Sequence, residues 1–214
     1  MIPGVSVVVA GMERLRLIHD GVTRIQEGMY VGLGLGIMYG IASLVVNLLG
    51  LTSVSLMIRG YGILQIAGVV VGVSVLYHYM YRGFNELVRA DRARYGIGML
   101  SIKVLLLISP LLLAEGLYLA LANASLIAFL LFRIINGITA LVLYVLILVA
   151  LYRLGSEFNT DKLKIGVIIT IVTVFILISP NVMAAIIGIV GIALILMGLG
   201  DVKRTIESRL GTGG

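Results

Sequence analysis

Charged residues stand inside two long apolar runs of this 214-residue chain. Glu115 lies in the run 98–121 and Arg133 in the run 126–152, and a short polar turn centred on Ala124 joins the runs. An ionisable side chain in such a run points to an ion pair, a gate or a solute path. Because Glu115 and Arg133 are equally far from Ala124, an antiparallel hairpin brings them to equal depth. We expect them to pair, and separate snorkelling of each charge toward the interface is the alternative.

Other side chains that could perform chemistry are sparse. The chain has no cysteine, which excludes disulfides and thiolate chemistry, and its two histidines are His19 and His78. It contains no HExxH, Walker A or GxSxG motif. We therefore expect no catalytic residue, no metal site and no cofactor, and predict that the protein is not an enzyme. Lys103 is expected to snorkel to the headgroups, with a place in an ion path as the alternative.

The composition is that of a membrane protein. The chain is 60% hydrophobic and 12% charged, and its mean hydropathy is +1.16. Soluble domains are about 45–50% apolar and about 25% charged, and a fold of this size could not hide so much apolar surface from water. The net charge of +6 comes from short loops between apolar runs, so membrane topology explains it better than nucleic-acid binding.

Six apolar runs have the length that a membrane-spanning helix needs, about 20 residues. Backbone polar groups in lipid must bond within the segment, so these runs are predicted to be helices. The predicted fold class is an all-α, polytopic integral membrane protein with about six transmembrane helices in three hairpins. The predicted spans are 29–50, 61–81, 98–121, 126–152, 163–180 and 182–202. The predicted divisions are an N-terminal extension and amphipathic cytoplasmic helix (1–28), a transmembrane domain (29–202) and a cytoplasmic tail (203–214).

The basic residues predict the orientation. They cluster before the first span, in the second and fourth connections and after the sixth span, whereas Arg59 is the one basic residue in the opposite connections. The positive-inside rule then places both termini in the cytoplasm, for a multi-pass protein of the plasma membrane. Residues 1–11 are interpreted as a flexible extension or a misassigned start before Met12.

The segment 12–28 and the connection between the second and third spans are predicted to be helical. Along 12–28, apolar residues recur at three- and four-residue steps. This helix either lies on the lipid headgroups or is a solvated lead-in to the first span. In the second connection, Phe84 and Leu87 share a face, and Gly96 and Gly98 are expected to break the helix before the third span.

An internal repeat of about 70 residues is visible. The segment Asp91–Gly96 returns as Asp161–Gly166, and Ser109-Pro110 returns as Ser179-Pro180. Parallel repeats occur in transporters, and plain gene duplication also produces them. Proline removes a backbone donor, so Pro110 is expected to kink the third span and Pro180 to end the fifth.

Glycines recur at four-residue spacing on the first two spans. Such spacing lets two helix backbones approach closely in lipid. We expect contacts within one chain, and a seam between copies is the alternative. The candidate packing residues are Gly32, Gly36, Gly40, Gly68 and Gly72.

Taken together, the charged amphipathic start, the repeated Asp-basic-x-basic-x-Gly segment, the Ser-Pro pairs and the charged tail from Asp201 resemble a family of uncharacterised multi-spanning membrane proteins of hyperthermophilic crenarchaea. The resemblance covers most of residues 12–210. It implies about six spans and an archaeal source, and it implies no particular activity. The function predicted is a non-enzymatic scaffold or accessory subunit whose partners are the lipid bilayer and a second copy or a larger membrane complex, without nucleic acid. The alternative is a small transporter or channel for an ion or small solute that uses Glu115 and Arg133.

Overall fold

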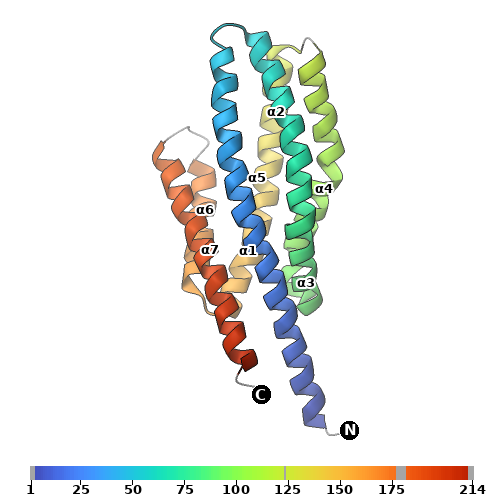
Figure 1. Cartoon of the computed structure of the whole chain (residues 1–214), viewed down its shortest axis with the longest axis vertical. Helices are drawn as coiled ribbons and strands as arrows, with labels where there is room; N and C mark the ends of the chain where they lie inside the picture. The colour runs from blue at the N-terminus through green and yellow to red at the C-terminus, as the bar shows by residue number, and fades with distance from the viewer. Residues whose placement is uncertain (1–2, 123, 177–181, 212–214) are drawn as a thin grey trace.

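The computed structural model is all-helical over the residues that it describes, which are 3–122, 124–176 and 182–211. The main helices run roughly side by side as a long bundle (Figure 1). They are α1 (Pro3–Leu49), α2 (Val54–Val75), a π-helical segment η1 (Leu76–Tyr81), α3 (Arg82–Ala90), α4 (Arg92–Leu121), α5 (Leu126–Glu157), α6 (Asp161–Ile176) and α7 (Val182–Gly211).

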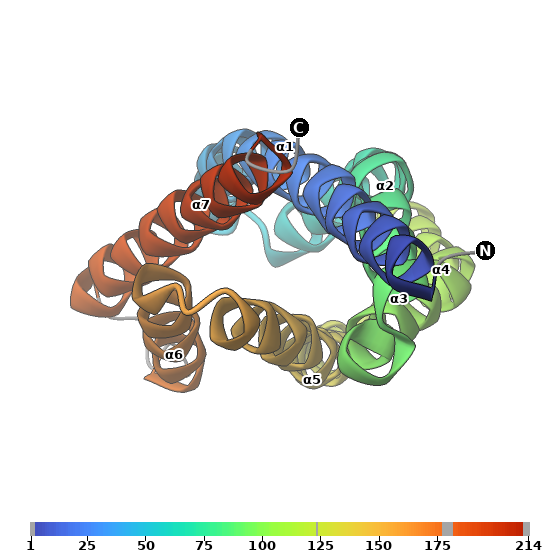
Figure 2. The same ribbon diagram turned by 90° about the horizontal axis from the view of Figure 1, so that it is seen from below.

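The helices form a closed ring. α1 packs on α2, α2 on α4, α4 on α5, α5 on α6, α6 on α7, and α7 returns to α1. Figure 2 shows this order from the end at which both termini lie. We call that end basal and the opposite end distal. The basal end carries α3 and the turn between α5 and α6, and the distal end carries the turns before α2 and before α5 (Figure 1).

Among the residues that the structure describes, four helices are long and apolar enough to cross a membrane. They are Ala10–Leu49, the continuous helix Val54–Ala90, Arg92–Leu121 and Leu126–Glu157. At 1.5 Å per residue, 30 residues extend about 45 Å, which exceeds a hydrocarbon core of about 30 Å. The all-helical class is confirmed, and the six-span count stays a prediction.

Polar side chains begin three of the helices. Ser53 and Ser125 accept hydrogen bonds from the backbone N–H groups of Leu56 and Ala128, and Asp91 accepts one from Arg94. Each bond satisfies one of the backbone donors that a helix N-terminus leaves without a partner. Asp91 has an extended backbone and separates α3 from α4. The predicted helical connection is therefore confirmed, but its break lies at Asp91, and α4 continues through Gly96 and Gly98 because a helix in a packed bundle tolerates glycine.

The predicted boundaries at 28/29 and 202/203 fall inside single helices. α1 runs from Pro3 to Leu49, so residues 3–11 belong to the same helix as the first predicted span. The apolar face of the lead-in is buried: Ile18, Val22 and Ile25 have no exposed surface. It packs against α3 and α7, which favours the lead-in interpretation over a helix lying on headgroups. The predicted tail likewise extends α7, and its Ile206 is buried.

The Ser-Pro pair in α4 is accommodated inside the helix. Pro110 cannot donate to the carbonyl of Leu106, four residues earlier. The Ser109 hydroxyl donates to that same carbonyl at 2.8 Å, and α4 continues to Leu121 as predicted. The kink at Pro110 stays a prediction, and Pro180 lies outside the described residues.

One buried core occupies the basal half. It draws residues from α1, α3, α4, α5, α6 and α7 and includes Tyr95, the largest fully buried side chain. The distal half has a second, small cluster of Ile58, Leu119 and Phe129. The polar residues described next surround that small cluster.

Candidate functional site: a polar pocket in the distal half

The polar residues of the distal half come from α2, α4 and α5. Arg133 and Asn136 are three residues apart on α5 and therefore share a face. Tyr61 and Gln65 are four residues apart on α2 and do the same. Glu115 lies on α4, which packs between these two helices in the ring. The ring thus brings all five side chains into one region.

Glu115 is held by an amide. The Nδ2 of Asn136 donates to both carboxylate oxygens of Glu115, at 2.8 and 2.9 Å. A hydrogen bond to a charged acceptor is shorter and stronger than one between neutral groups. It offsets part of the free energy that a carboxylate loses when it leaves water. This bond ties α4 to α5.

Arg133 rests on aromatic rings. Its guanidinium carbon lies 4.8 Å from the ring centroid of Tyr61 and 5.7 Å from that of Phe129. The negative ring faces attract a cation, and more strongly where water is scarce. Tyr61 is in turn positioned by its hydroxyl, which donates to the side-chain oxygen of Asn47 at 2.7 Å.

The two intramembrane charges therefore have different partners. Instead of the predicted ion pair, the structure gives Glu115 the amide of Asn136 and gives Arg133 the rings of Tyr61 and Phe129. The ion pairs within the described residues do not include Glu115 with Arg133. Equal distance from the turn fixes depth but not the direction in which each side chain leaves its helix.

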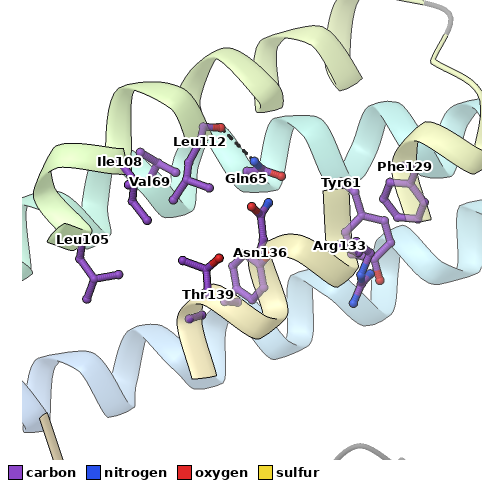
Figure 3. Close-up of a pocket in the computed structure, with 12 residues that line it drawn as sticks. Tyr61, Gln65, Val69, Leu105, Ile108, Leu112, Phe129, Arg133, Asn136 and Thr139 are labelled. Carbon is purple, nitrogen blue, oxygen red and sulfur yellow. Dashed lines mark hydrogen bonds between the residues drawn. The ribbon is translucent and has the colours of Figure 1, made fainter. Parts of the chain in front are cut away.

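A cavity of about 290 Å³ lies between α1, α2, α4 and α5. We call it the polar pocket. Figure 3 shows Arg133, Tyr61 and Phe129 gathered at one end, Leu105, Ile108 and Val69 at the other, and Asn136 and Gln65 between them. The Gln65 amide donates to the Leu112 carbonyl at 2.9 Å. The residues that line the polar pocket are Tyr39, Tyr61, Gln65, Val69, Leu105, Ile108, Leu112, Phe129, Arg133, Asn136, Thr139 and Ala140.

Three residues of this region were not singled out by the sequence. Asn136 follows Arg133 by one helical turn, and Gln65 is one of two glutamines in the chain. Tyr61 precedes Gln65 by one turn. A search for polar residues on the same helical face as each intramembrane charge would have found Asn136. Nothing in the sequence joins Gln65 to Arg133, because they come from different hairpins.

The glycines at four-residue spacing, which we call the glycine stripes (Gly32, Gly36 and Gly40 on α1, Gly68 and Gly72 on α2), mostly face open space. A methyl group placed on Gly32, Gly36, Gly40 or Gly72 would meet nothing within 4 Å, and one on Gly68 would touch only the ring of Tyr39. Of these five glycines, Gly68 alone therefore faces a neighbouring helix, through a side chain of α1, and none of the five brings two backbones close together. Close helix contacts use other glycines: Gly62 with Gly116, Gly21 with Gly83, and Gly166 with Gly191.

The basal end holds a second polar cluster, around Glu157. This carboxylate, 11% exposed, accepts from Arg14 at 2.5 Å and from the hydroxyl of Tyr95 at 2.6 Å. Arg94 lies 3.2 Å from it and also pairs with Asp91. These contacts tie α1, α4 and the end of α5 together, so this cluster holds three helices of the ring to one another at the basal end.

The two histidines have ordinary partners. His19 lies 3.2 Å from Glu207 of α7, and His78 lies 3.1 Å from the Ser74 carbonyl. Among the residues that the structure describes, no group of three His, Cys, Asp or Glu side chains could hold a metal ion. Lys103 is exposed on α4.

The fold and the pocket define a class. Over its described part, the chain is an all-helical protein with four apolar helices of membrane-spanning length and a polar cluster among them. The chain belongs to a family described as "Protein of unknown function (DUF973)", whose model matches residues 5–212. No curated protein matches the chain. No solved structure matches it either.

Proposed function

We propose that the protein is a six-span membrane protein that acts as a non-enzymatic scaffold or accessory subunit. The proposal places it in the plasma membrane of a hyperthermophilic archaeon, with both termini in the cytoplasm. Its partners are the bilayer and a second copy or a larger membrane complex, without nucleic acid. α6 and α7 complete the six spans, since their predicted apolar runs extend over 163–180 and 182–202.

The closure of the basal half carries this proposal. A transporter or channel needs a polar route through the whole bundle, which is either permanently open or opens during each transport cycle. Here the side chains beneath the polar pocket are a packed core shared by six helices, with Tyr95, Leu154 and Leu199 fully buried. The charges at that end bind helices to one another through Glu157. Interiors packed in this way resist rearrangement, which supports a structural role.

The second candidate is a small transporter or channel, because the polar pocket gathers the cation Arg133 with Asn136 and Gln65. Ionisable residues inside a membrane line solute paths more often than they serve packing alone. In this alternative the basal half would have to open during each cycle.

Two single-cysteine variants of this cysteine-free chain separate the candidates. Thr139 lines the polar pocket, whereas Ser101 is completely buried in the basal half and is nearly isosteric with cysteine. In proteoliposomes, a membrane-impermeant maleimide should label Thr139→Cys from the distal side and leave Ser101→Cys unlabelled from either side. Labelling of Ser101→Cys from the basal side would show a basal opening and favour the transporter. The thiol count after denaturation is the control for both variants.

The orientation is tested in the same way in sealed cells. Leu51, 83% exposed in the first distal turn, should react with the external maleimide as Leu51→Cys. Arg89 of α3 and Asn159 of the α5–α6 turn are exposed at the basal end, and Arg89→Cys and Asn159→Cys should react only after the membrane is opened. The reverse pattern would place the termini outside.

A further inference from the structure

The polar pocket adjoins a second hollow. A groove of about 740 Å³ runs along α1, α2 and α4 and is lined almost entirely by apolar side chains and glycines. We call it the apolar groove. It shares five lining residues with the polar pocket: Tyr39, Gln65, Val69, Leu105 and Leu112. The two hollows therefore adjoin, and together they offer a polar end and a long apolar end.

The polar end is suited to an anion. Arg133 lies over aromatic rings, and the ion pairs found among the described residues do not include it. A guanidinium can donate two parallel hydrogen bonds to a phosphate while one face stays on a ring. Glu115 does not line the pocket, and its carboxylate is already bound by Asn136. An anion in the pocket would therefore meet Arg133 first.

The depth of the polar end matches a lipid headgroup region. Arg133 is seven residues into α5, so it lies about 10 Å from the distal end of the helix at 1.5 Å per residue. α5 is about 48 Å long by the same rise, well beyond the hydrocarbon thickness of about 30 Å. The excess length lets the level of Arg133 coincide with the distal interface.

The groove leads from there toward the middle of the bundle. Along α2 and the first residue of η1 its lining extends from Leu64 to Leu76, about 18 Å at 1.5 Å per residue. Gly36 and Gly72 lie on its walls, and a methyl group on either would meet no atom. The missing side chains leave the space in which a flexible hydrocarbon chain can lie.

We propose that the two hollows together bind a phospholipid of the distal leaflet, with its phosphate on Arg133 and one hydrocarbon chain in the apolar groove. The site goes beyond the scaffold role and does not depend on it. Charge favours a lipid over a helix of a second copy. Glu115 is the one acidic residue of the chain in the distal half, since the other Asp and Glu residues lie toward the basal end. A parallel copy could therefore bring few anions to the depth of Arg133.

The test is native mass spectrometry of the full-length protein, delipidated in a neutral detergent. Dioleoyl phosphatidylglycerol and dioleoyl phosphatidylcholine are titrated separately. We expect phosphatidylglycerol to bind about tenfold more tightly, because its headgroup carries a net negative charge, whereas the choline of phosphatidylcholine neutralises the charge of its phosphate. Arg133→Gln should reduce phosphatidylglycerol binding to the level of phosphatidylcholine. The matched control Lys103→Gln removes a positive charge from an apolar run outside both hollows and should leave binding unchanged.

A second pair of variants tests the groove without touching the charge. Gly72→Leu fills open space in the groove and should lower binding of both lipids about tenfold, with no loss of thermal stability. Gly32→Leu fills open space on α1 that lines neither hollow and should leave binding unchanged. Glycerol 3-phosphate, which has no hydrocarbon chain, should not compete with phosphatidylglycerol at equal concentration.

Three results would overturn the proposal. If Arg133→Gln and the unchanged chain bind phosphatidylglycerol equally well, Arg133 does not bind the headgroup. Competition by glycerol 3-phosphate would identify a small-anion site instead of a lipid site. A dimer that Gly72→Leu abolishes while lipid binding persists would show that a second copy fills the groove.

Discussion

The basal and distal halves of the bundle are held together by different means. The basal half has a continuous apolar core and the charged cluster around Glu157, which joins three helices. The distal half has a core of three buried residues and a hollow lined by Arg133 and Gln65. Stability within a protein is not uniform, and binding sites are found where packing is sparse. The comparison indicates that the basal half maintains the fold and that the distal half is free to bind.

The largest difference should appear at glycines that differ in their surroundings. A methyl group on Gly198 would lie 2.5 Å from the backbone nitrogen of Leu163, so α6 and α7 would have to separate. Gly198→Ala should lower stability by about 3 kcal/mol, and thus the Tm in detergent by about 6–12 °C. Gly137→Ala, whose new methyl group would meet nothing within 4 Å, is the control and should not lower the Tm. Equal Tm values would show that the basal packing is looser than described.

The next largest effect is expected at Glu157. Glu157→Gln removes the charge that faces Arg14 and Arg94 and should cost about 2 kcal/mol, between the values for surface and buried ion pairs. Tyr95→Phe removes one hydrogen bond to Glu157 and should cost about 1 kcal/mol. Thermal unfolding in detergent measures both. The exposed Glu13→Gln is the control, and a loss equal to that of Glu157→Gln would argue against a special role for the cluster.

A smaller loss is expected in the distal half. Asn136→Leu leaves the carboxylate of Glu115 without its amide donor. Hydrogen bonds between membrane helices contribute about 0.6 kcal/mol on average and up to about 1.7, so we expect a loss of about 1 kcal/mol. Ile138→Leu, on the exposed side of the same helix, keeps the volume and should be neutral. No loss in Asn136→Leu would mean that this bond does not hold α4 to α5.

The smallest effect is the coupling between the two intramembrane charges. Because Glu115 and Arg133 have different partners, a double-mutant cycle of Glu115→Gln and Arg133→Gln should give a coupling below about 0.3 kcal/mol. The cycle of Glu115→Gln and Asn136→Leu should give more than about 0.5 kcal/mol. Thermal stability of the single and double variants measures both. A larger coupling energy in the first cycle than in the second would support the predicted ion pair between Glu115 and Arg133.

Much of the fold could be predicted from local sequence. The apolar runs predicted helices because lipid offers the backbone no hydrogen-bond partner. The three- and four-residue spacing of Ile18, Val22 and Ile25 predicted one apolar face of a helix, and the structure shows that this face packs on α3 and α7. The helical connection was predicted for the same reason. Its break was misplaced at Gly96 because Asp91, which caps α4, is the stronger signal.

The glycine stripes show where local reasoning fails. A stripe such as Gly32, Gly36 and Gly40 marks a helix face that another backbone could approach. It does not say whether one does, and in the structure these three face open space. The close contact between helix backbones is made instead by Gly62 and Gly116, which lie on helices of different hairpins.

The sequence by itself determined the helical class, the helical lead-in and connection, and the uncommon charges at Glu115 and Arg133. These features depend on a residue and its near neighbours. Only the tertiary structure decided that Asn136 binds Glu115, that Arg133 lies on Tyr61, and that Glu157 binds Arg14 and Tyr95 at the basal end. The rotation of each helix about its axis selects these partners, and packing across the whole ring sets that rotation.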